Sequence, residues 1–235
     1  MRPWPSWWSI GRTEVPMNKI LWLILGFSAA SLQAQDPARF NNEVAEIAAS
    51  HRGQKADVVL LGSSSVKMWK DCHTCLEEYT VINSGFGGSQ TSDLLVHWPV
   101  LTLEHEPKIV FVYEGDNDLA AGEHPDSIIL EMKRWVEQAQ EAMPNALLIL
   151  VGAKPSPSRL QFEEQYFQFN DLLYALCEEM GLGYVDTWGA LADYGAVREE
   201  YFLADRLHLN ADGYVHWCEA FRRTLADFEA KGMLE

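Results

Sequence analysis

The chain has 235 residues, with 34 acidic side chains against 18 Lys and Arg and a formal net charge of −16. So acidic a surface repels phosphate backbones, and the sequence has no basic patch, which excludes nucleic acid as an expected partner. Four cysteines, an even number, permit up to two disulfides if the chain folds in an oxidising compartment.

The first predicted element is a leader over residues 1–34. From Met17 the sequence reads MNKILWLILGFSAASLQAQ, in which Lys19 precedes an apolar run that small residues follow. This order is typical of a secretory signal peptide, and the run over Ile20–Phe27 is too short for a membrane-spanning helix, which takes about 20 residues. An uncleaved anchor or a buried helix fits the order less well. We therefore expect an exported protein, periplasmic or secreted, with a mature domain over residues 35–235 and no stable membrane insertion after cleavage.

Short apolar runs and longer amphipathic segments alternate along the mature chain. The apolar runs predict strands at 57–61, 80–83, 108–113, 146–151 and 183–186. The amphipathic segments predict helices at 40–51, 125–142, 162–180 and, with Asn210 as N-cap, up to Ala230. This alternation predicts a single doubly wound α/β domain, with helices on both faces of a parallel sheet of about five strands. Ligands bind beyond the carboxyl ends of the strands in such sheets, so the segments after each strand are the places to look for a site.

Three strands are followed by polar or glycine-rich motifs. They read GSSS at 62–65, NSGFGGS at 83–89 and GDND at 115–118. A serine in a tight turn at a helix start, a glycine loop that exposes an N–H group and an asparagine amide are together suited to acyl transfer. Taken singly, each motif has an ordinary structural explanation as a helix cap, a flexible turn or an Asx turn.

A fourth motif, Asp205-Arg206-Leu207-His208, precedes the last predicted helix. The spacing of three places both outer side chains on one side of a turn, where the carboxylate can hold the imidazole in one tautomer. An imidazole held in this way can take a proton from a serine and return it to a leaving group. An isolated His–carboxylate pair is more often structural, so the interpretation depends on all four motifs occurring in order.

In their order and spacing the motifs resemble those of the SGNH hydrolases, also called GDSL-type lipases and acylhydrolases. The similarity extends from about Asp57 to Leu225. The segment Gly62–Trp69 is similar to a GSSS-type branch of that family. The resemblance implies a flavodoxin-like fold and a two-step hydrolysis of carboxylic esters that uses no cofactor and no metal. Nor does the sequence show a metal-ligand spacing.

The resemblance also implies the role of each site residue. The nucleophile falls on Ser64, the base on His208 and the residue that orients the base on Asp205. The oxyanion hole falls on the N–H groups of Ser64 and Gly88 and on the side-chain amide of Asn117.

The sequence departs from the family pattern at several positions. Ser63 replaces the usual aspartate, and Ser65 is a competing candidate for the nucleophile. Asp116 replaces a common second glycine and adds a negative charge near the oxyanion side, and Ser89 stands where aspartate is frequent. None of these changes removes a catalytic group.

The substrate is predicted less directly. No long apolar insertion could serve as a lid, which favours a small acyl group, such as acetyl on a carbohydrate, over a long-chain lipid. A thioesterase, a lysophospholipase-type enzyme, a peptidase or a non-catalytic ligand-binding protein on the same fold are the alternatives, and the oligomeric state stays open. Six residues near the loops could line a pocket, although for most of them we expect core packing: Trp69, Phe86, Trp98, Tyr113, Pro155 and Tyr201.

The cysteines allow more than one arrangement. Cys72 and Cys75 form a CxxC motif, for which a structural disulfide or unpaired thiols are favoured over redox chemistry. Cys177 and Cys218 fall in two predicted helices and could pair only if those helices pack together.

Overall fold

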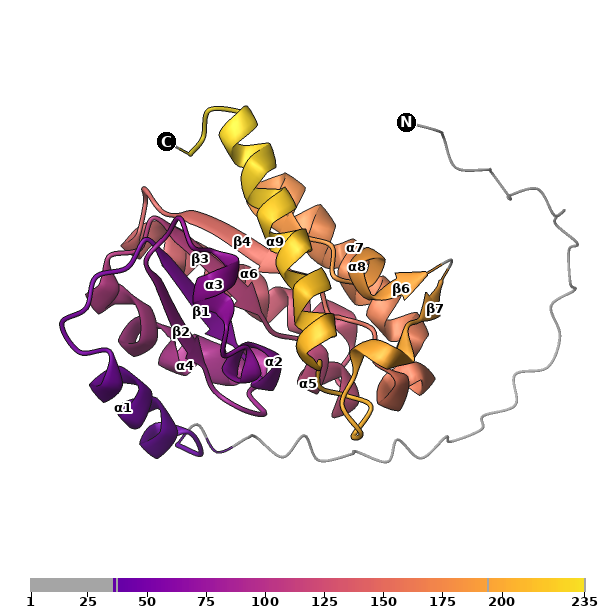
Figure 1. Cartoon of the computed structure of the whole chain (residues 1–235). Coiled ribbons are helices and arrows are strands. Elements are labelled where there is room, and N and C mark those ends of the chain that lie inside the picture. Colours follow the sequence, from indigo (N-terminus) through magenta and orange to yellow (C-terminus); the bar gives the residue numbers. More distant parts are fainter. Residues whose placement is uncertain (1–35, 37, 194, 235) are drawn as a thin grey trace, which may run out of the picture. The chain divides into compact units, whose positions relative to one another are not determined.

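Five parallel strands form the centre of the fold in the computed structural model, which describes residues 36, 38–193 and 195–234 (Figure 1). The strands are β1 (Val58–Gly62), β2 (Val81–Gly85), β3 (Ile109–Tyr113), β4 (Leu147–Val151) and β5 (Gly183–Val185). Their spatial order is β2-β1-β3-β4-β5, and every neighbouring pair is parallel. All five predicted strands are confirmed, whereas the predicted leader lies outside the described residues.

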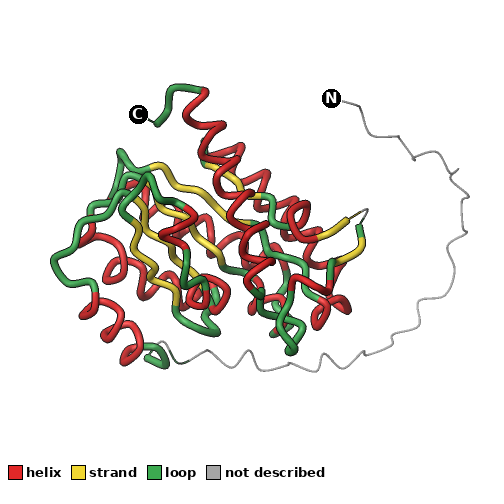
Figure 2. Tube along the Cα trace, in the orientation of Figure 1, coloured by secondary structure: helices red, strands yellow, loops and turns green. Residues whose placement is uncertain are grey.

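Helices cover both faces of this sheet (Figures 1 and 2). The helices packed on one face are α1 (Asn41–Ser50), α4 (Thr91–Thr102), α6 (Pro125–Ala142) and α7 (Glu163–Met180). Those on the other are α2 (Ser64–Met68), α3 (Cys72–Cys75), α8 (Trp188–Leu191) and α9 (Ala211–Ala230). The side chains of β1 alternate between the two cores, since Val59 and Leu61 join the first and Val58 and Leu60 the second. The predicted doubly wound α/β fold is therefore confirmed.

The strand order explains where a site can form. The chain runs from β1 outward to β2 and then returns to β3 on the other side of β1, so β1 lies at the point where the winding direction reverses. In open α/β sheets, the loops that follow the strands on either side of such a point leave a crevice. The motifs after β1, β2 and β3 all belong to this edge of the sheet.

The four predicted helices are confirmed within two residues at each end. Asn210 is the N-cap of α9, because its Oδ1 accepts the Gly213 N–H at 3.0 Å. Helix α4 was not predicted, although a capping box formed by Gln90 and Asp93 marks its start. Pro99 inside α4 interrupts the ordinary sequence pattern of a helix.

The remaining short elements lie in the connections. They are α5 (Asp116–Ala120), the hairpin of β6 (Ala192–Asp193) and β7 (Ala196–Val197), and the 3₁₀ helices Leu103–His105, Pro157–Phe162 and Glu199–Tyr201. Among the described residues no helix is both long and apolar enough to cross a membrane.

The cysteine pairing differs from both arrangements considered from the sequence. A disulfide joins Cys75 of α3 to Cys218 of α9, with a Cα–Cα distance of 5.7 Å across 143 residues of sequence. Cys72 and Cys177 are buried free thiols. A Cys177–Cys218 pair is impossible because α7 and α9 cover opposite faces of the sheet. A Cys72–Cys75 pair does not form because Cys75 is bonded to α9 instead.

Candidate active site

Ser64 is the first residue of α2, directly after the central strand β1. The preceding turn requires glycine at position 62, where φ is 142° and an added Cβ would lie 2.3 Å from the Tyr113 carbonyl oxygen. Gly62 therefore lets β1 pass close to β3 and then turn sharply into α2. The turn leaves the Ser64 side chain partly exposed, whereas Ser63 and Ser65 are each only 1% exposed.

His208 and Asp205 lie on the loop before α9. Oδ2 of Asp205 is 2.7 Å from Nδ1 of His208, and Oδ1 accepts the backbone N–H groups of Leu207 at 2.9 Å and His208 at 3.0 Å. Arg206 takes a left-handed conformation, with φ 60°, that closes this turn. The carboxylate thus has both oxygens occupied by donors from the residues that follow it.

The same contacts govern the ionisation of Asp205. Its slight burial raises the pKa, but the hydrogen bonds from the His208 ring and from the two backbone N–H groups outweigh that effect and lower the pKa to about 2. Asp205 is therefore an ionised acceptor across the ordinary pH range. Since an ionised carboxylate can only accept, the hydrogen of the neutral imidazole lies on Nδ1.

With its hydrogen on Nδ1, His208 presents Nε2 as an acceptor. Ser64 Oγ lies 2.9 Å from this Nε2 atom and can donate its hydroxyl hydrogen to it. Of the three adjacent serines in the described GSSS turn, Ser64 is the one whose hydroxyl reaches the ring. The structure thus brings Ser64, His208 and Asp205 into one hydrogen-bonded chain.

The other two predicted site residues lie on neighbouring loops. Gly88 is exposed, with φ 83°, in the loop between β2 and α4. Asn117, on α5 after β3, is partly exposed and donates from Nδ2 to the Ser89 carbonyl oxygen at 2.8 Å. That bond ties α5 to the residue that follows Gly88, so the two candidate donors come from loops that are in contact.

Asp116 is nearly buried, and its charge is balanced by residues that were not anticipated from the sequence. The carboxylate contacts the Arg159 guanidinium and the Tyr166 hydroxyl, and it accepts the Tyr113 hydroxyl at 2.8 Å. Lys154, itself 0% exposed, places Nζ 3.7 Å from the same carboxylate. Burial raises the pKa of Asp116, but the charges of Lys154 and Arg159 outweigh burial, so the pKa is lowered and the group is ionised.

Sequence reasoning missed Lys154 and Arg159, although one signal was available. Both follow the predicted strand 146–151, so they come from the carboxyl end of a strand, at the same edge as the other motifs. An aspartate in a motif that usually carries glycine would also need cationic partners once buried. The position of Lys154 and Arg159 after a strand, together with the need of Asp116 for a cation, could have identified both residues as its partners.

The residues considered as pocket lining belong mostly to the core. Tyr201 is partly exposed, and the others are buried: Trp69, Phe86, Trp98, Tyr113 and Pro155. The expectation of core packing for most of them is confirmed.

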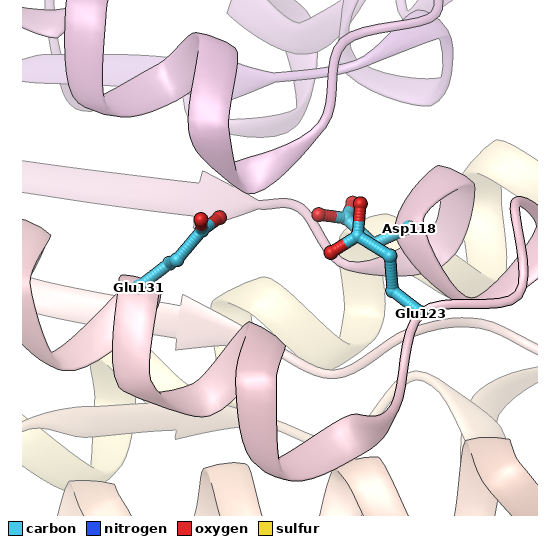
Figure 3. Close-up of side chains that lie close together, drawn as sticks. All are labelled: Asp118, Glu123 and Glu131. Atoms are coloured by element: carbon cyan, nitrogen blue, oxygen red, sulfur yellow. The ribbon is translucent and has the colours of Figure 1, made fainter. Parts of the chain in front are cut away.

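Three carboxylates that the sequence spacing did not indicate lie close together beside α4. Asp118, Glu123 and Glu131 each place one oxygen within 4.8 Å of the others, and Figure 3 shows their carboxylates converging. Oxygen ligands of this kind suit hard cations. Asp118 already accepts the Thr91 N–H at 2.9 Å, and Glu123 accepts the Gln90 Nε2–H at 3.1 Å, so these two residues anchor the start of α4. Burial raises the pKa of Asp118 to about 7 and also raises the pKa of both glutamates.

The chain resembles known proteins in both sequence and fold. The model of the GDSL-like lipase/acylhydrolase family matches residues 62–215. No curated protein matches the sequence significantly. Among solved structures, a GDSL-like lipase from Bacteroides thetaiotaomicron superposes with a TM-score of 0.67 at 16% identity, covering 82% of this chain and 99% of that one. A catalytic mutant of an acetylxylan esterase from Geobacillus stearothermophilus gives a TM-score of 0.61 at 16% identity, covering 74% and 95%. At these identities the two structures show a shared fold.

Proposed function

Since this chain belongs to the GDSL-like lipase/acylhydrolase family and is an ester-hydrolysing enzyme, we propose that Ser64 is its nucleophile and His208 its general base, oriented by Asp205. The observation that carries the proposal is the continuous chain of contacts from Ser64 Oγ to His208 Nε2 at 2.9 Å and from His208 Nδ1 to Asp205 Oδ2 at 2.7 Å. A nucleophile in contact with a base that a third group orients is the arrangement that acyl transfer requires.

The reaction proceeds in two steps. Ser64 Oγ attacks the ester carbonyl while His208 Nε2 takes the hydroxyl proton, and Asp205 stabilises the imidazolium that forms. The carbon–oxygen bond to the alcohol then breaks, and His208 returns the proton to the departing alcohol. Water attacks the acyl-enzyme, again with His208 as base, which releases the carboxylic acid and regenerates Ser64.

The negative charge that develops on the carbonyl oxygen needs donors that are already in place. We assign these donors to the backbone N–H groups of Ser64 and Gly88 and to the side-chain Nδ2 of Asn117. Ser64 begins α2, Gly88 precedes Ser89 in the chain, and Asn117 donates to the Ser89 carbonyl oxygen. Losing one donor of this kind typically costs about 3 kcal/mol of barrier, or roughly a hundredfold in rate.

The substrate class that we propose is a small acyl ester, such as an acetyl group on a carbohydrate. The acetylxylan esterase among the structural neighbours supports this class, as does the lack of a lid-like apolar insertion in the sequence. Because four of the five aromatic side chains near the loops are buried in the core, few are left to form a deep acyl pocket.

A second candidate, hydrolysis of longer acyl esters, is favoured by one observation. An apolar groove of about 620 Å³ lies between α2, α3 and the start of α9, lined among others by Met68, Leu203, Leu209 and Tyr214. Leu209 adjoins His208, and the Tyr214 hydroxyl donates to the Ser65 carbonyl oxygen at 2.8 Å. A series of p-nitrophenyl esters from acetate to decanoate separates the two candidates. An enzyme for small acyl groups should show a kcat/KM that falls with chain length, and an enzyme for longer acyl groups should show one that rises.

We also propose that the protein is exported. The leader pattern over residues 1–34 supports export, and so does the Cys75–Cys218 disulfide, because disulfides persist mainly in oxidising compartments. Fractionation of cells that express the full chain tests this, with the mature form expected outside the cytoplasm.

The test of the catalytic assignment is hydrolysis of p-nitrophenyl acetate by the purified protein and by two serine variants. We expect Ser64→Ala to lower kcat by about 10⁴-fold or more while circular dichroism stays unchanged. Ser65→Ala, the matched control from the same turn, should retain most of the activity. Full activity in Ser64→Ala, or its loss only in Ser65→Ala, would move the nucleophile to another residue.

A further inference from the structure

Arg159 reaches from the 3₁₀ helix Pro157–Phe162 to the start of α5. Its Nη1 donates to the Asp116 carbonyl oxygen at 2.9 Å and also contacts the Asp116 carboxylate. Its Nη2 donates to Oδ1 of Asn117 at 2.9 Å. The guanidinium side chain is only 15% exposed, and its planar fork holds two consecutive residues of α5 at once.

This contact determines which way the Asn117 amide faces. Oδ1 accepts from Arg159 while Nδ2 donates to the Ser89 carbonyl oxygen at 2.8 Å. If the amide were rotated by half a turn, its NH₂ group would face the guanidinium donors and its oxygen would face a carbonyl oxygen. Both new contacts would be repulsive, so only the observed orientation of the amide satisfies the hydrogen bonds with Arg159 and Ser89. The second hydrogen on Nδ2 is then left for a ligand.

The charge around Asp116 also depends on Arg159. The carboxylate lies between two basic side chains, Arg159 and Lys154, which together offset its negative charge inside the protein. Lys154 Nζ further donates to the Leu207 carbonyl oxygen at 2.9 Å, in the residue before His208. The buried network thus contacts both the Asn117 side and the His208 loop.

We propose that Arg159 is a positioning residue for ester hydrolysis, which holds the Asn117 amide so that its free N–H faces the oxyanion. The inference rests on the proposed function, because it requires Asn117 to stabilise an oxyanion. It explains how this chain carries an aspartate in a motif position where glycine is common.

The test is a double-mutant cycle on the full-length chain with p-nitrophenyl acetate as substrate. Arg159→Met keeps much of the side-chain volume but removes both the charge and the hydrogen bonds. We expect kcat to fall by about 10- to 100-fold while KM changes by less than about threefold, because the lost interaction acts on the transition state. Arg134→Met, which removes an exposed arginine from α6, is the matched control and should leave kcat and KM unchanged.

The cycle separates positioning from general damage to the fold. In the Asn117→Ala background, Arg159→Met should lower kcat by less than about threefold further, because the group that it positions is already absent. An equal loss in both backgrounds, or a kcat for Arg159→Met within about threefold of the wild type, would overturn the proposal.

If Arg159→Met does not fold, Arg159→Lys replaces it in the cycle. Lysine keeps a cation beside Asp116 but lacks the second arm that reaches Asn117, so the same non-additive loss is expected and additive losses overturn the proposal. Failure of the proposed function is seen separately, since Ser64→Ala or Asn117→Ala would then retain wild-type kcat whatever Arg159 does.

Discussion

Asp205 holds His208 with both carboxylate oxygens: Oδ2 lies 2.7 Å from the ring Nδ1, and Oδ1 accepts the backbone N–H of the same histidine at 3.0 Å. The ring and the backbone of His208 are thereby fixed by one side chain three residues earlier. The arrangement leaves Nε2 facing Ser64, although the Asp205 side chain is itself 48% exposed.

Replacing that carboxylate should impair the chemical step. We expect Asp205→Asn to lower kcat for p-nitrophenyl acetate by about 10²- to 10⁴-fold with little change in KM, because the amide stabilises the wrong tautomer and no longer stabilises the imidazolium. Since the pKa of Asp205 is about 2, the loss should persist at every pH between 5 and 9. Asp212→Asn, at an exposed position early in α9, should change kcat little. Equal kcat in Asp205→Asn and the wild type would show that the pair is only structural.

The turn before Ser64 should tolerate no side chain at position 62. Gly62→Ala would force a Cβ to within 2.3 Å of the Tyr113 carbonyl oxygen at a φ of 142°, so we expect the free energy of unfolding to fall by more than about 3 kcal/mol. Gly53→Ala is the matched control, because Gly53 also has a positive φ, 71°, but no atom within 4 Å of an added Cβ. Gly53→Ala should lower the free energy of unfolding by only about 1–2 kcal/mol. Similar losses in urea unfolding for the two variants would contradict this account of the turn.

The disulfide between α3 and α9 should contribute to stability. Cys75→Ala with Cys218→Ala should lower the free energy of unfolding by about 2–5 kcal/mol, since the bond closes a long loop of the unfolded chain. Dithiothreitol should lower the Tm of the wild type but not that of the double variant. Cys72→Ala, which removes a free thiol from the same helix, should keep the sensitivity to dithiothreitol. A wild-type Tm that dithiothreitol leaves unchanged would argue against the bond.

Asp118 should make stability depend on pH. Burial raises its pKa to about 7, so the folded protein binds this proton more tightly than the unfolded chain, whose aspartates titrate near pH 4. The stabilisation that comes from this proton is complete below about pH 4. It is lost as the pH rises to about 7, which lowers the free energy of unfolding by up to about 4 kcal/mol. Asp118→Asn keeps an acceptor for the Thr91 N–H and should flatten this decline in urea unfolding. The exposed variant Asp227→Asn should follow the wild-type curve, and an Asp118→Asn curve parallel to the wild type would contradict the assignment.

The sheet could be predicted from the sequence because its strands are buried on both faces. Runs such as Ile109–Tyr113 are apolar at every position, and that signal does not depend on knowing the neighbouring strands. Helix α4 was missed because Pro99 disturbs its pattern and its capping box uses Gln90 in place of the usual serine or threonine.

The site residues could be proposed from motif order, but the network around Asp116 could not. The contacts of Arg159 and Lys154 with Asp116 span about 40 residues of sequence, and no local pattern reports such a distance. The cysteine pairing could not be predicted for the same reason, since Cys75 and Cys218 meet only because α3 and α9 pack on the same face of the sheet. Long-range partners of buried charges and thiols follow from the topology rather than from spacing.

The central claim, that Ser64 is the nucleophile, is tested most directly by covalent labelling. A fluorophosphonate should form a bond from its phosphorus to Ser64 Oγ with loss of fluoride, and mass spectrometry of the digested protein should place the added mass on Ser64. Ser65→Ala should label like the wild type, and Ser64→Ala should not label at all. Label found on Ser65 or on a residue outside the GSSS turn, or undiminished labelling of Ser64→Ala, would contradict the assignment.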